Sequence, residues 1–257
     1  MPIPVVSKAQ MVEVLREIGV GFGDGLLVHS ALQFLGKPEN GPQTFLDALL
    51  EVVGPGGTIA VPAFNFGFAH GLDYDPALAP AEKMGVFSEF LRQQPGVKRT
   101  RHPMQSLAIQ GAWAHEVALL DTPSAFEEGS VFDHLLKHDF KLLLLGAEVQ
   151  AASIVHYSEQ RARVPYRFWK DFTGRIKIDG RWQTRTYRMF VRDLELDPHL
   201  HLQPIEDAMK ANEQWTAQEL NYGQVALGRL KDFVAAADDL LQEDPWALIG
   251  NRKELGV

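Results

Sequence analysis

Two short apolar segments that flank a helix pattern place the strongest constraint on the fold. Residues 26–28 and 58–61 have the length and apolar character of buried strands. Between them, apolar side chains recur at helical spacing until Gly54 ends the pattern; they are Phe45, Leu46, Leu49, Leu50 and Val53. The order strand, helix, strand is typical of a parallel sheet covered by helices.

Further segments extend this pattern along the chain. Ser7 has the character of an N-cap for a helix that Gly19 ends, and residues 141–145 are expected to form another buried strand. Helices are also predicted around residues 86–92 and 156–163. The glycine-rich and proline-rich segment between residues 65 and 83 has no clear period, which is typical of a functional loop.

The second half of the chain changes character. Residues 173–193 alternate as strands do, with Asp179 and Gly180 as the turn of a β-hairpin. A long amphipathic helix is predicted near the end from Val225, Leu227, Leu230, Phe233, Val234 and Leu241. We therefore expect a single α/β domain over residues 1–257, with a central, mainly parallel sheet flanked by helices and an additional antiparallel hairpin.

The composition excludes several classes of function. The chain has no cysteine, so a thiol nucleophile, a cysteine zinc site and a disulfide framework are excluded. A net charge of −8 argues against a duplex-DNA partner. Residues 1–8 contain no long apolar run, and the apolar stretches elsewhere are too short to cross a bilayer. We expect a cytoplasmic protein with no nucleic-acid or membrane partner; a homo-oligomer remains open.

Three familiar motifs are missing from the chain. Its glycines form neither a GxGxxG fingerprint nor a P-loop, and no GxSxG elbow frames Ser30. His134 and His138 would share one helix face, and His199 and His201 one strand face. Because no HExxH motif or neighbouring carboxylate pattern accompanies these pairs, we expect no metal.

One histidine has a more suggestive position. His156 follows the strand at residues 141–145 and a loop, near the start of a predicted helix. Functional residues of α/β sheets gather at the carboxyl ends of strands. Glu159 would be its neighbour on the helix and could hold the tautomer of the imidazole. Spacing alone leaves a catalytic pair and a solvated ion pair both open.

A series of short blocks between about residues 25 and 165 occurs in a recognisable order. They read VHSAL (28–32), GPGGT (54–58), PAF (62–64), MGV (84–86), RTRHPMQSLA (99–108), LLLG (143–146) and SIVHYSE (153–159). Together they resemble the aminoglycoside 3-N-acetyltransferase family, an acetyltransferase type with an α/β fold distinct from the GCN5-related enzymes.

The resemblance implies a reaction and a set of site residues. Acetyl-CoA would be the donor, a primary amine such as that of an aminoglycoside antibiotic the acceptor, and transfer would be direct in a ternary complex. The general base would be His156, with Glu159 and Ser106 as further catalytic candidates. Cofactor contacts are expected from Ser30, Ala31, Leu32, Lys37, Arg101 and Ser106, and acceptor contacts from Phe64, Glu148 and Gln150.

Departures from the family pattern leave the acceptor open. Gln150 stands where members that acetylate antibiotics often carry an aspartate, six residues before His156. A basic segment follows the base, made of Arg161, Arg163, Arg167, Lys170 and Arg175. It would suit an acidic acceptor, such as an amino sugar on a nucleotide or an aminophosphonate, or it is a solvated face.

Other interpretations also stay open at this point. Asp171 and Glu206 are further acids that folding could bring to His156. His102, before Pro103, either shapes a turn or belongs to the site. A metal-dependent hydrolase built on the histidine pairs and a non-catalytic CoA-binding module are the alternative functions.

Overall fold

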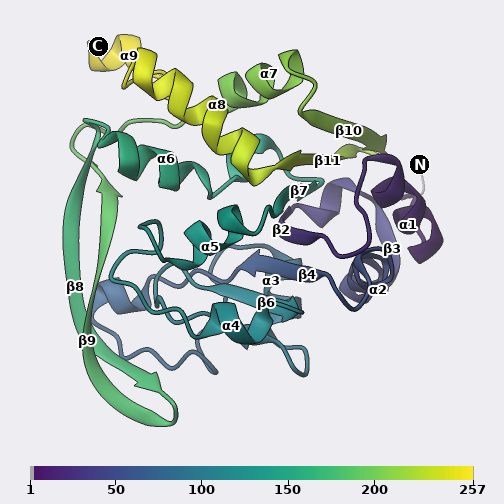
Figure 1. The fold of residues 1–257 in the computed structure, drawn as a ribbon, viewed down its shortest axis with the longest axis horizontal. Coiled ribbons are helices and arrows are strands. Elements are labelled where there is room, and N and C mark those ends of the chain that lie inside the picture. The colour runs from purple at the N-terminus through teal and green to yellow at the C-terminus, as the bar shows by residue number, and fades with distance from the viewer. Residues whose placement is uncertain (1–2, 257) are drawn as a thin grey trace.

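A seven-stranded sheet forms the centre of the computed structural model, which describes residues 3–256 (Figure 1). The strand order is β10-β11-β7-β2-β4-β6-β5. The strands are β2 (Gly25–Ser30), β4 (Thr58–Pro62), β5 (Lys98–Arg99), β6 (Leu107–Gly111), β7 (Lys141–Leu145), β10 (Trp215–Leu220) and β11 (Gly223–Arg229). The prediction of a single α/β domain with a central sheet, flanking helices and a separate hairpin is confirmed.

The sheet is mixed rather than mainly parallel. Strand β2 pairs in parallel with β4 and with β7, and every other pair of neighbours is antiparallel. The difference arises because β10 and β11 add a hairpin to one edge, and because β6 runs opposite to β4. The parallel part predicted from residues 26–61 is therefore only the middle of the sheet.

Alternating side chains on the strands build a core on each face of the sheet. Leu26 and Val28 of β2 point to one face, where helices α1 (Lys8–Glu17), α2 (Pro42–Val53) and α3 (Val86–Arg92) cover them. Leu27 points to the other face and packs with side chains of α5 (Val131–Lys137), α6 (Val155–Ala162) and α8 (Leu230–Glu243).

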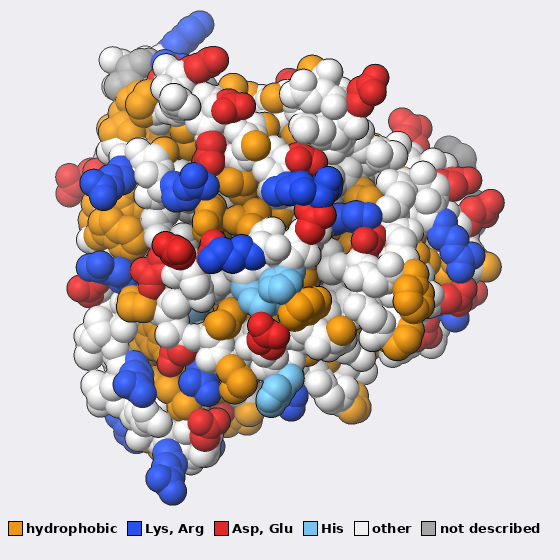
Figure 2. Space-filling view, viewed as in Figure 1, with side chains coloured by type: hydrophobic (Ala, Val, Ile, Leu, Met, Phe, Trp, Pro, Cys, Tyr) orange, Lys and Arg blue, Asp and Glu red, His pale blue; other side chains and the backbone are white. Residues whose placement is uncertain are grey.

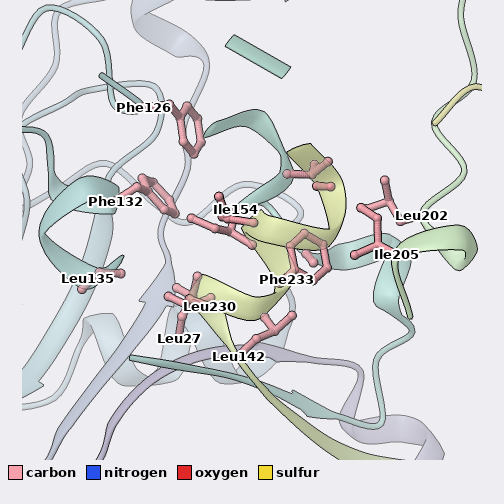
Figure 3. Close-up of a cluster of buried hydrophobic side chains, with 14 of the residues drawn as sticks. Leu27, Phe126, Phe132, Leu135, Leu142, Ile154, Leu202, Ile205, Leu230 and Phe233 are labelled. Atoms are coloured by element: carbon pink, nitrogen blue, oxygen red, sulfur yellow. The ribbon is translucent and has the colours of Figure 1, made fainter. Parts of the chain in front are cut away.

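Figure 3 shows this second core layer. Leu27 and Leu142 of the sheet lie beside Leu230 and Phe233 of α8, and Ile154 lies between this group and Phe132 of α5. Ile154 immediately precedes α6, so burial of its side chain holds the start of that helix against the core. The helix that carries His156 is thus fixed at its first turn.

Two predicted helix boundaries are confirmed, and a third is wrong. Ser7 caps α1 by accepting a hydrogen bond from the Gln10 N–H at 3.2 Å, as its position predicts. Gly54 follows α2 with a φ of 63°, a backbone region that favours glycine. The predicted helix from Val225 is wrong in its first part, because Val225 and Leu227 belong to β11 and α8 starts only at Leu230.

A long two-stranded hairpin stands apart from the central sheet. Strands β8 (Arg167–Ile178) and β9 (Arg181–Arg192) pair along their whole length at one side of the molecule (Figure 1). Asp179 and Gly180 both have positive φ, as the predicted primed turn requires. The hairpin starts earlier than the predicted residue 173, because the exposed first residues of β8 lack a clear alternation.

The segment between β4 and α3 supports this hairpin. Tyr74 donates its backbone N–H to the Arg175 carbonyl and accepts from the Lys177 N–H, each at 2.9 Å. Tyr74 also belongs to a small buried cluster with Phe68, Met104, Ile176, Ile178 and Tyr187. The loop predicted here is therefore a packed support for the hairpin.

The remaining elements are short. They are β1 (Val5–Val6), β3 (Lys37–Gly41), η1 (Leu32–Phe34), η2 (Gly67–His70), η3 (Val149–Ala151), α4 (Ala114–Ala118), α7 (Gln203–Ala211) and α9 (Arg252–Leu255). Between residues 3 and 256, none of the helices has the length and apolar character needed to cross a membrane.

Candidate active site

The centre of the sheet contains a topological switch point. Strand β2 has parallel neighbours on both sides, and the chain continues from β2 to β4 on one side while β7 lies on the other. The segments that leave β2 and β7 therefore diverge at the carboxyl ends of these strands, which is where α/β sheets usually bind ligands. The Ala31 N–H still donates to the Leu145 carbonyl at 2.9 Å, so the two segments separate just beyond this bond.

A cleft of about 930 Å³ opens at this point, and we call it the switch-point cleft. Its walls are the segment after β2, the segment after β7 and the turn between β10 and β11. The residues are Ser30, Ala31, Phe34, Gly146, Ala147, Glu148, Gln150, Ala151, Glu219, Asn221, Tyr222, Gly223 and Gln224. The fold thus brings together four of the predicted cofactor and acceptor residues, namely Ser30, Ala31, Glu148 and Gln150.

The charge of the switch-point cleft is negative. Glu148 and Glu219 contribute carboxylates from opposite parts of the chain, and the described residues that line the cleft include neither lysine nor arginine. Amide side chains add further polar groups, although Gln150 accepts a hydrogen bond from the Leu202 N–H at 3.1 Å. Such a lining favours a cationic ligand over an anionic one.

His156 lies in the first turn of α6 and is held by a buried carboxylate. Its Nδ1 is 2.5 Å from Glu159 Oε2. The Glu159 side chain is 0% exposed, whereas 28% of the His156 side chain is exposed. The other oxygen of Glu159, Oε1, accepts from Arg167 Nε at 2.9 Å. One carboxylate therefore bridges a partly accessible imidazole and a guanidinium that is 9% exposed.

The environment keeps Glu159 ionised. Burial would raise its pKa, but the hydrogen bond and charge of His156 and those of Arg167 outweigh burial, and the pKa lies below its usual value. A carboxylate that only accepts hydrogen bonds requires the proton on His156 Nδ1. In the neutral ring, Nε2 then carries the lone pair and can act as a base.

The ring of His156 also has an aromatic neighbour. Its edge-to-face partner is Phe126, with ring centroids 5.5 Å apart and planes at 78°. A second cleft, of about 850 Å³, lies beside this region. It is lined by Phe126, Glu127, Glu128, Asp133, Lys137, Tyr157, Gln160, Arg161, Arg163 and Trp169. His156 is therefore adjacent in sequence to Tyr157 and packs on Phe126, and both of these residues line the second cleft.

His29 lies between the switch-point cleft, which its neighbour Ser30 lines, and the segment that precedes His156. His29, at the end of β2, is buried, and its Nε2 is 3.4 Å from both the backbone nitrogen and the hydroxyl of Ser153. Burial lowers the pKa of His29 to about 4, so its imidazole is neutral at physiological pH. Sequence reasoning placed His29 in a motif without assigning it a role, because its contact with Ser153 depends on the fold.

Ser106 lies in a separate buried cluster. Its hydroxyl donates to the Ala63 carbonyl at 2.9 Å, accepts from Arg99 Nε at 3.0 Å and lies 3.3 Å from the Tyr74 hydroxyl. Because a serine hydroxyl has one hydrogen, the bond to Ala63 would have to break before Ser106 could donate to a substrate. The catalytic role of Ser106 stays a prediction.

The other predicted cofactor and acceptor residues do not line the switch-point cleft. Lys37 is exposed on β3, and Leu32 packs against the core from η1. Arg101 lies 3.9 Å from an Asp121 carboxylate oxygen and 3.8 Å from one of Asp179. Phe64 is buried in the core. Their predicted roles stay untested.

Most of the basic segment after the base is already paired. Arg161 contacts Asp238 at 3.2 Å, Arg175 contacts Asp73 at 3.1 Å, and Arg167 is bound to Glu159. Three of the five cationic groups in this segment are thus paired with carboxylates, which weakens the argument for an acidic acceptor.

The alternative acids have other partners. Asp171 pairs with Arg188 across the hairpin, and Glu206 pairs with Lys210 on α7. His102 is buried in a turn, where its Nδ1 accepts from the Gln105 N–H at 3.1 Å. Glu159 is therefore the carboxylate that the fold gives to His156, as helical spacing predicted.

Comparisons with known proteins find relatives of this chain. The family described as aminoglycoside 3-N-acetyltransferase matches residues 27–242. Aminoglycoside N(3)-acetyltransferase VIII of Streptomyces fradiae is 29% identical, over 92% of this chain and 81% of the relative. Aminoglycoside N(3)-acetyltransferase VII of Streptomyces paromomycinus is 31% identical, over 72% of this chain and 70% of the relative. The structure of AAC-IIIb in a binary complex with CoASH superposes with a TM-score of 0.82 and 25% identity, covering 93% of this chain and 97% of that one.

Proposed function

The chain belongs to the aminoglycoside 3-N-acetyltransferase family, a class of acyl-CoA-dependent N-acetyltransferases, and we propose that it acetylates a primary amine of an aminoglycoside with His156 as the general base. The observation that carries this proposal is the chain of contacts from His156 through Glu159 to Arg167. It supplies an imidazole with a fixed tautomer and a buried negative charge to stabilise its protonated form.

The reaction needs one base and no covalent enzyme intermediate. The amine enters mainly as an ammonium ion and must lose a proton before its lone pair can attack the thioester carbonyl carbon. His156 Nε2 accepts that proton while Glu159 stabilises the imidazolium. The new C–N bond forms, the C–S bond breaks, and its electron pair leaves with the CoA sulfur. The attacking nitrogen loses its second excess proton to solvent, and the His156 imidazolium returns the first proton to the sulfur, which gives the free thiol. Both substrates are bound together, so transfer is direct.

We place the substrates in the switch-point cleft, with their reacting ends directed toward His156 along the segment after β7, which lines the cleft as far as Ala151 and leads into α6. Ser30 supplies a hydroxyl at its wall, which we assign to the thioester oxygen or the pantetheine arm. The Ala31 N–H is committed to Leu145, so it is not a free donor there. The bound CoASH of the related AAC-IIIb supports acetyl-CoA as the donor. Lys37 and Arg101 remain predictions for its phosphates.

The acceptor is proposed to be cationic. Glu148 and Glu219 make the cleft acidic, although Gln150, six residues before His156, is uncharged. Ammonium groups of an aminoglycoside would be attracted to these carboxylates, whereas a nucleotide or a phosphonate would be repelled. The acidic acceptors suggested by the basic segment are therefore the less favoured class.

Release of CoA thiol tests the proposal directly. Purified protein is mixed with acetyl-CoA and a panel of aminoglycosides, an amino sugar nucleotide and an aminophosphonate. We expect turnover with aminoglycosides and a fall of about 10²- to 10⁴-fold in kcat for His156→Ala. His199→Ala, at an exposed histidine that contacts Asp197, is the matched control. Undiminished turnover in His156→Ala would exclude the base, and turnover with the anionic acceptors alone would exclude the acceptor class.

A further inference from the structure

A second cluster of chemically active side chains lies where α4 meets α5. Glu116 belongs to α4, and His134 and His138 lie four residues apart on α5 and its C-cap. One potential donor atom from each residue lies within 4.8 Å of the other two. The imidazole rings of His134 and His138 are 4.1 Å apart at their centroids, and His134 Nδ1 is 3.9 Å from Glu116 Oε1.

The environment of His134 points to a missing ligand. Its side chain is only 11% exposed, and its Nε2 is buried with no hydrogen-bond partner among residues 3–256. Buried polar atoms in native proteins nearly always have a partner, so this unpaired nitrogen needs an explanation, and the other nitrogen of the same ring, Nδ1, is the one that lies near Glu116. Trp113 packs on His138 with ring centroids 4.0 Å apart and covers one side of the cluster.

We propose that Glu116, His134 and His138 bind one divalent transition-metal ion, with zinc as the best fit. Two imidazoles four residues apart on a helix and a carboxylate from a neighbouring helix form a common ligand set for zinc. A fourth position is left to water, because His138 and Glu116 reach the surface. Histidine side chains reach the surface near the middle of the face in Figure 2, among acidic and hydrophobic side chains.

Closure around the ion requires only a small movement. Nitrogen and oxygen ligands of one tetrahedral zinc ion lie roughly 3.4 Å from each other, given bonds of about 2.0–2.1 Å. The donors here are somewhat farther apart, and the Glu116 side chain, which is 60% exposed, is free to approach.

Metal binding would join two short helices. Helix α4 has five residues and α5 has seven. Asp133 of α5, next to His134, accepts a hydrogen bond from the Tyr157 hydroxyl at 2.9 Å, so α5 is in turn attached to α6. The ion would therefore stabilise the folded chain at a position distinct from the side chains that carry the proposed acetyl transfer.

Calorimetric titration with zinc chloride tests the site. The chain is prepared without a histidine tag and stripped with a chelator; the lack of cysteine removes competing thiolates. We expect one zinc per chain, a higher Tm with zinc, and a loss of affinity of about tenfold or more in Glu116→Gln and His134→Gln. His199→Gln, at the other histidine–carboxylate pair, is expected to bind zinc as the unaltered chain does.

The outcomes separate clearly. His134 is mostly buried, so a destabilised His134→Gln would leave Glu116→Gln, at a largely exposed side chain, as the decisive variant. Equal zinc affinity in Glu116→Gln and the unaltered chain would overturn the site, and so would the absence of micromolar binding. Loss of binding in His199→Gln alone would move the site to Asp197 and overturn the proposal.

Discussion

Arg167 Nε donates to Glu159 Oε1 at 2.9 Å, although the two residues come from different elements. Glu159 lies inside α6, and Arg167 is the first residue of β8. This bond fixes the carboxylate from the side opposite to His156 and compensates its charge, so that the second oxygen stays available for the imidazole. Arg167 is therefore a positioning residue in the proposed reaction.

Replacement of Arg167 should impair the base through its carboxylate. Without the guanidinium, burial would raise the pKa of Glu159, and the carboxylate would be protonated at a higher pH. We expect Arg167→Gln to lower kcat by about 10- to 100-fold and to shift the acid limb of the kcat/KM profile to higher pH, with partial rescue in Arg167→Lys. Arg175→Gln, which removes an exposed arginine–aspartate pair, is the control. An unshifted acid limb in Arg167→Gln would contradict the role.

Two buried histidines should make stability depend on pH. Burial lowers the pKa of His29 and of His102 from 6.5 to about 4. Between these values the unfolded chain binds more protons than the folded one, so stability is complete above pH 6.5 and falls as the pH drops toward 4. Each residue contributes at most about 1.4 kcal/mol per pH unit in this window.

Urea unfolding at pH 7 and pH 5 measures this effect. His29→Gln should show a shallower loss of unfolding free energy than the unaltered chain, by up to about 2 kcal/mol over the interval. His115→Gln, at an exposed histidine, should keep the original slope. If His29→Gln and the unaltered chain lose the same free energy, His29 is not the titrating group.

Gly146 should tolerate no side chain. It has a φ of 70°, and a Cβ there would lie 2.7 Å from the Ala31 carbonyl oxygen, between the two segments that open the cleft. We expect Gly146→Ala to lower the free energy of unfolding by about 1–3 kcal/mol and to reduce turnover. Gly129→Ala is a matched control, because Gly129 has a φ of 78° with open space around it. Equal losses in both variants would attribute the effect to φ alone and not to the contact with Ala31.

The acidic wall of the cleft should set the affinity for cationic amines. We expect the double variant Glu148→Gln and Glu219→Gln to raise KM for aminoglycosides by about three- to tenfold at low salt, with a smaller effect at high salt. Glu13→Gln with Glu17→Gln, on the exposed face of α1, carries the same change in net charge. An unchanged KM in the cleft variant would exclude these carboxylates from acceptor binding.

Much of the fold follows from local patterns, and the exceptions have physical causes. The segment from β2 to β4 is predicted well because residues 26–28 and 59–61 at the centres of its strands are apolar and Gly54 marks the helix end. Strand β10 is at the edge of the sheet, and only Trp215 and Leu220 in it are buried, so it has no hydrophobic alternation. Strand β11 is followed directly by α8, and its apolar residues merge with the helical pattern.

The contacts of the candidate site are likewise predictable where they are local in the sequence and not where they depend on the fold. Glu159 is predictable because one helix turn sets its distance from His156. Arg167 is not, because its approach depends on the left-handed Arg163, φ 52°, which ends α6 and turns the chain toward β8. Glu116 reaches the His134 and His138 pair only through the contact of α4 with α5, which no spacing in the sequence encodes.

The division between local and distant contributions also bears on how enzymes of this kind diversify. The proposed base, its carboxylate and its arginine all come from residues 156–167, whereas part of the switch-point wall comes from the β10–β11 turn, far along the chain. With the acceptor bound as we propose, mutations in that turn would alter which amine is admitted while the contacts among His156, Glu159 and Arg167 are inherited unchanged. Acceptor specificity would then broaden or narrow through single substitutions in this turn, while the residues proposed to transfer the proton stay the same.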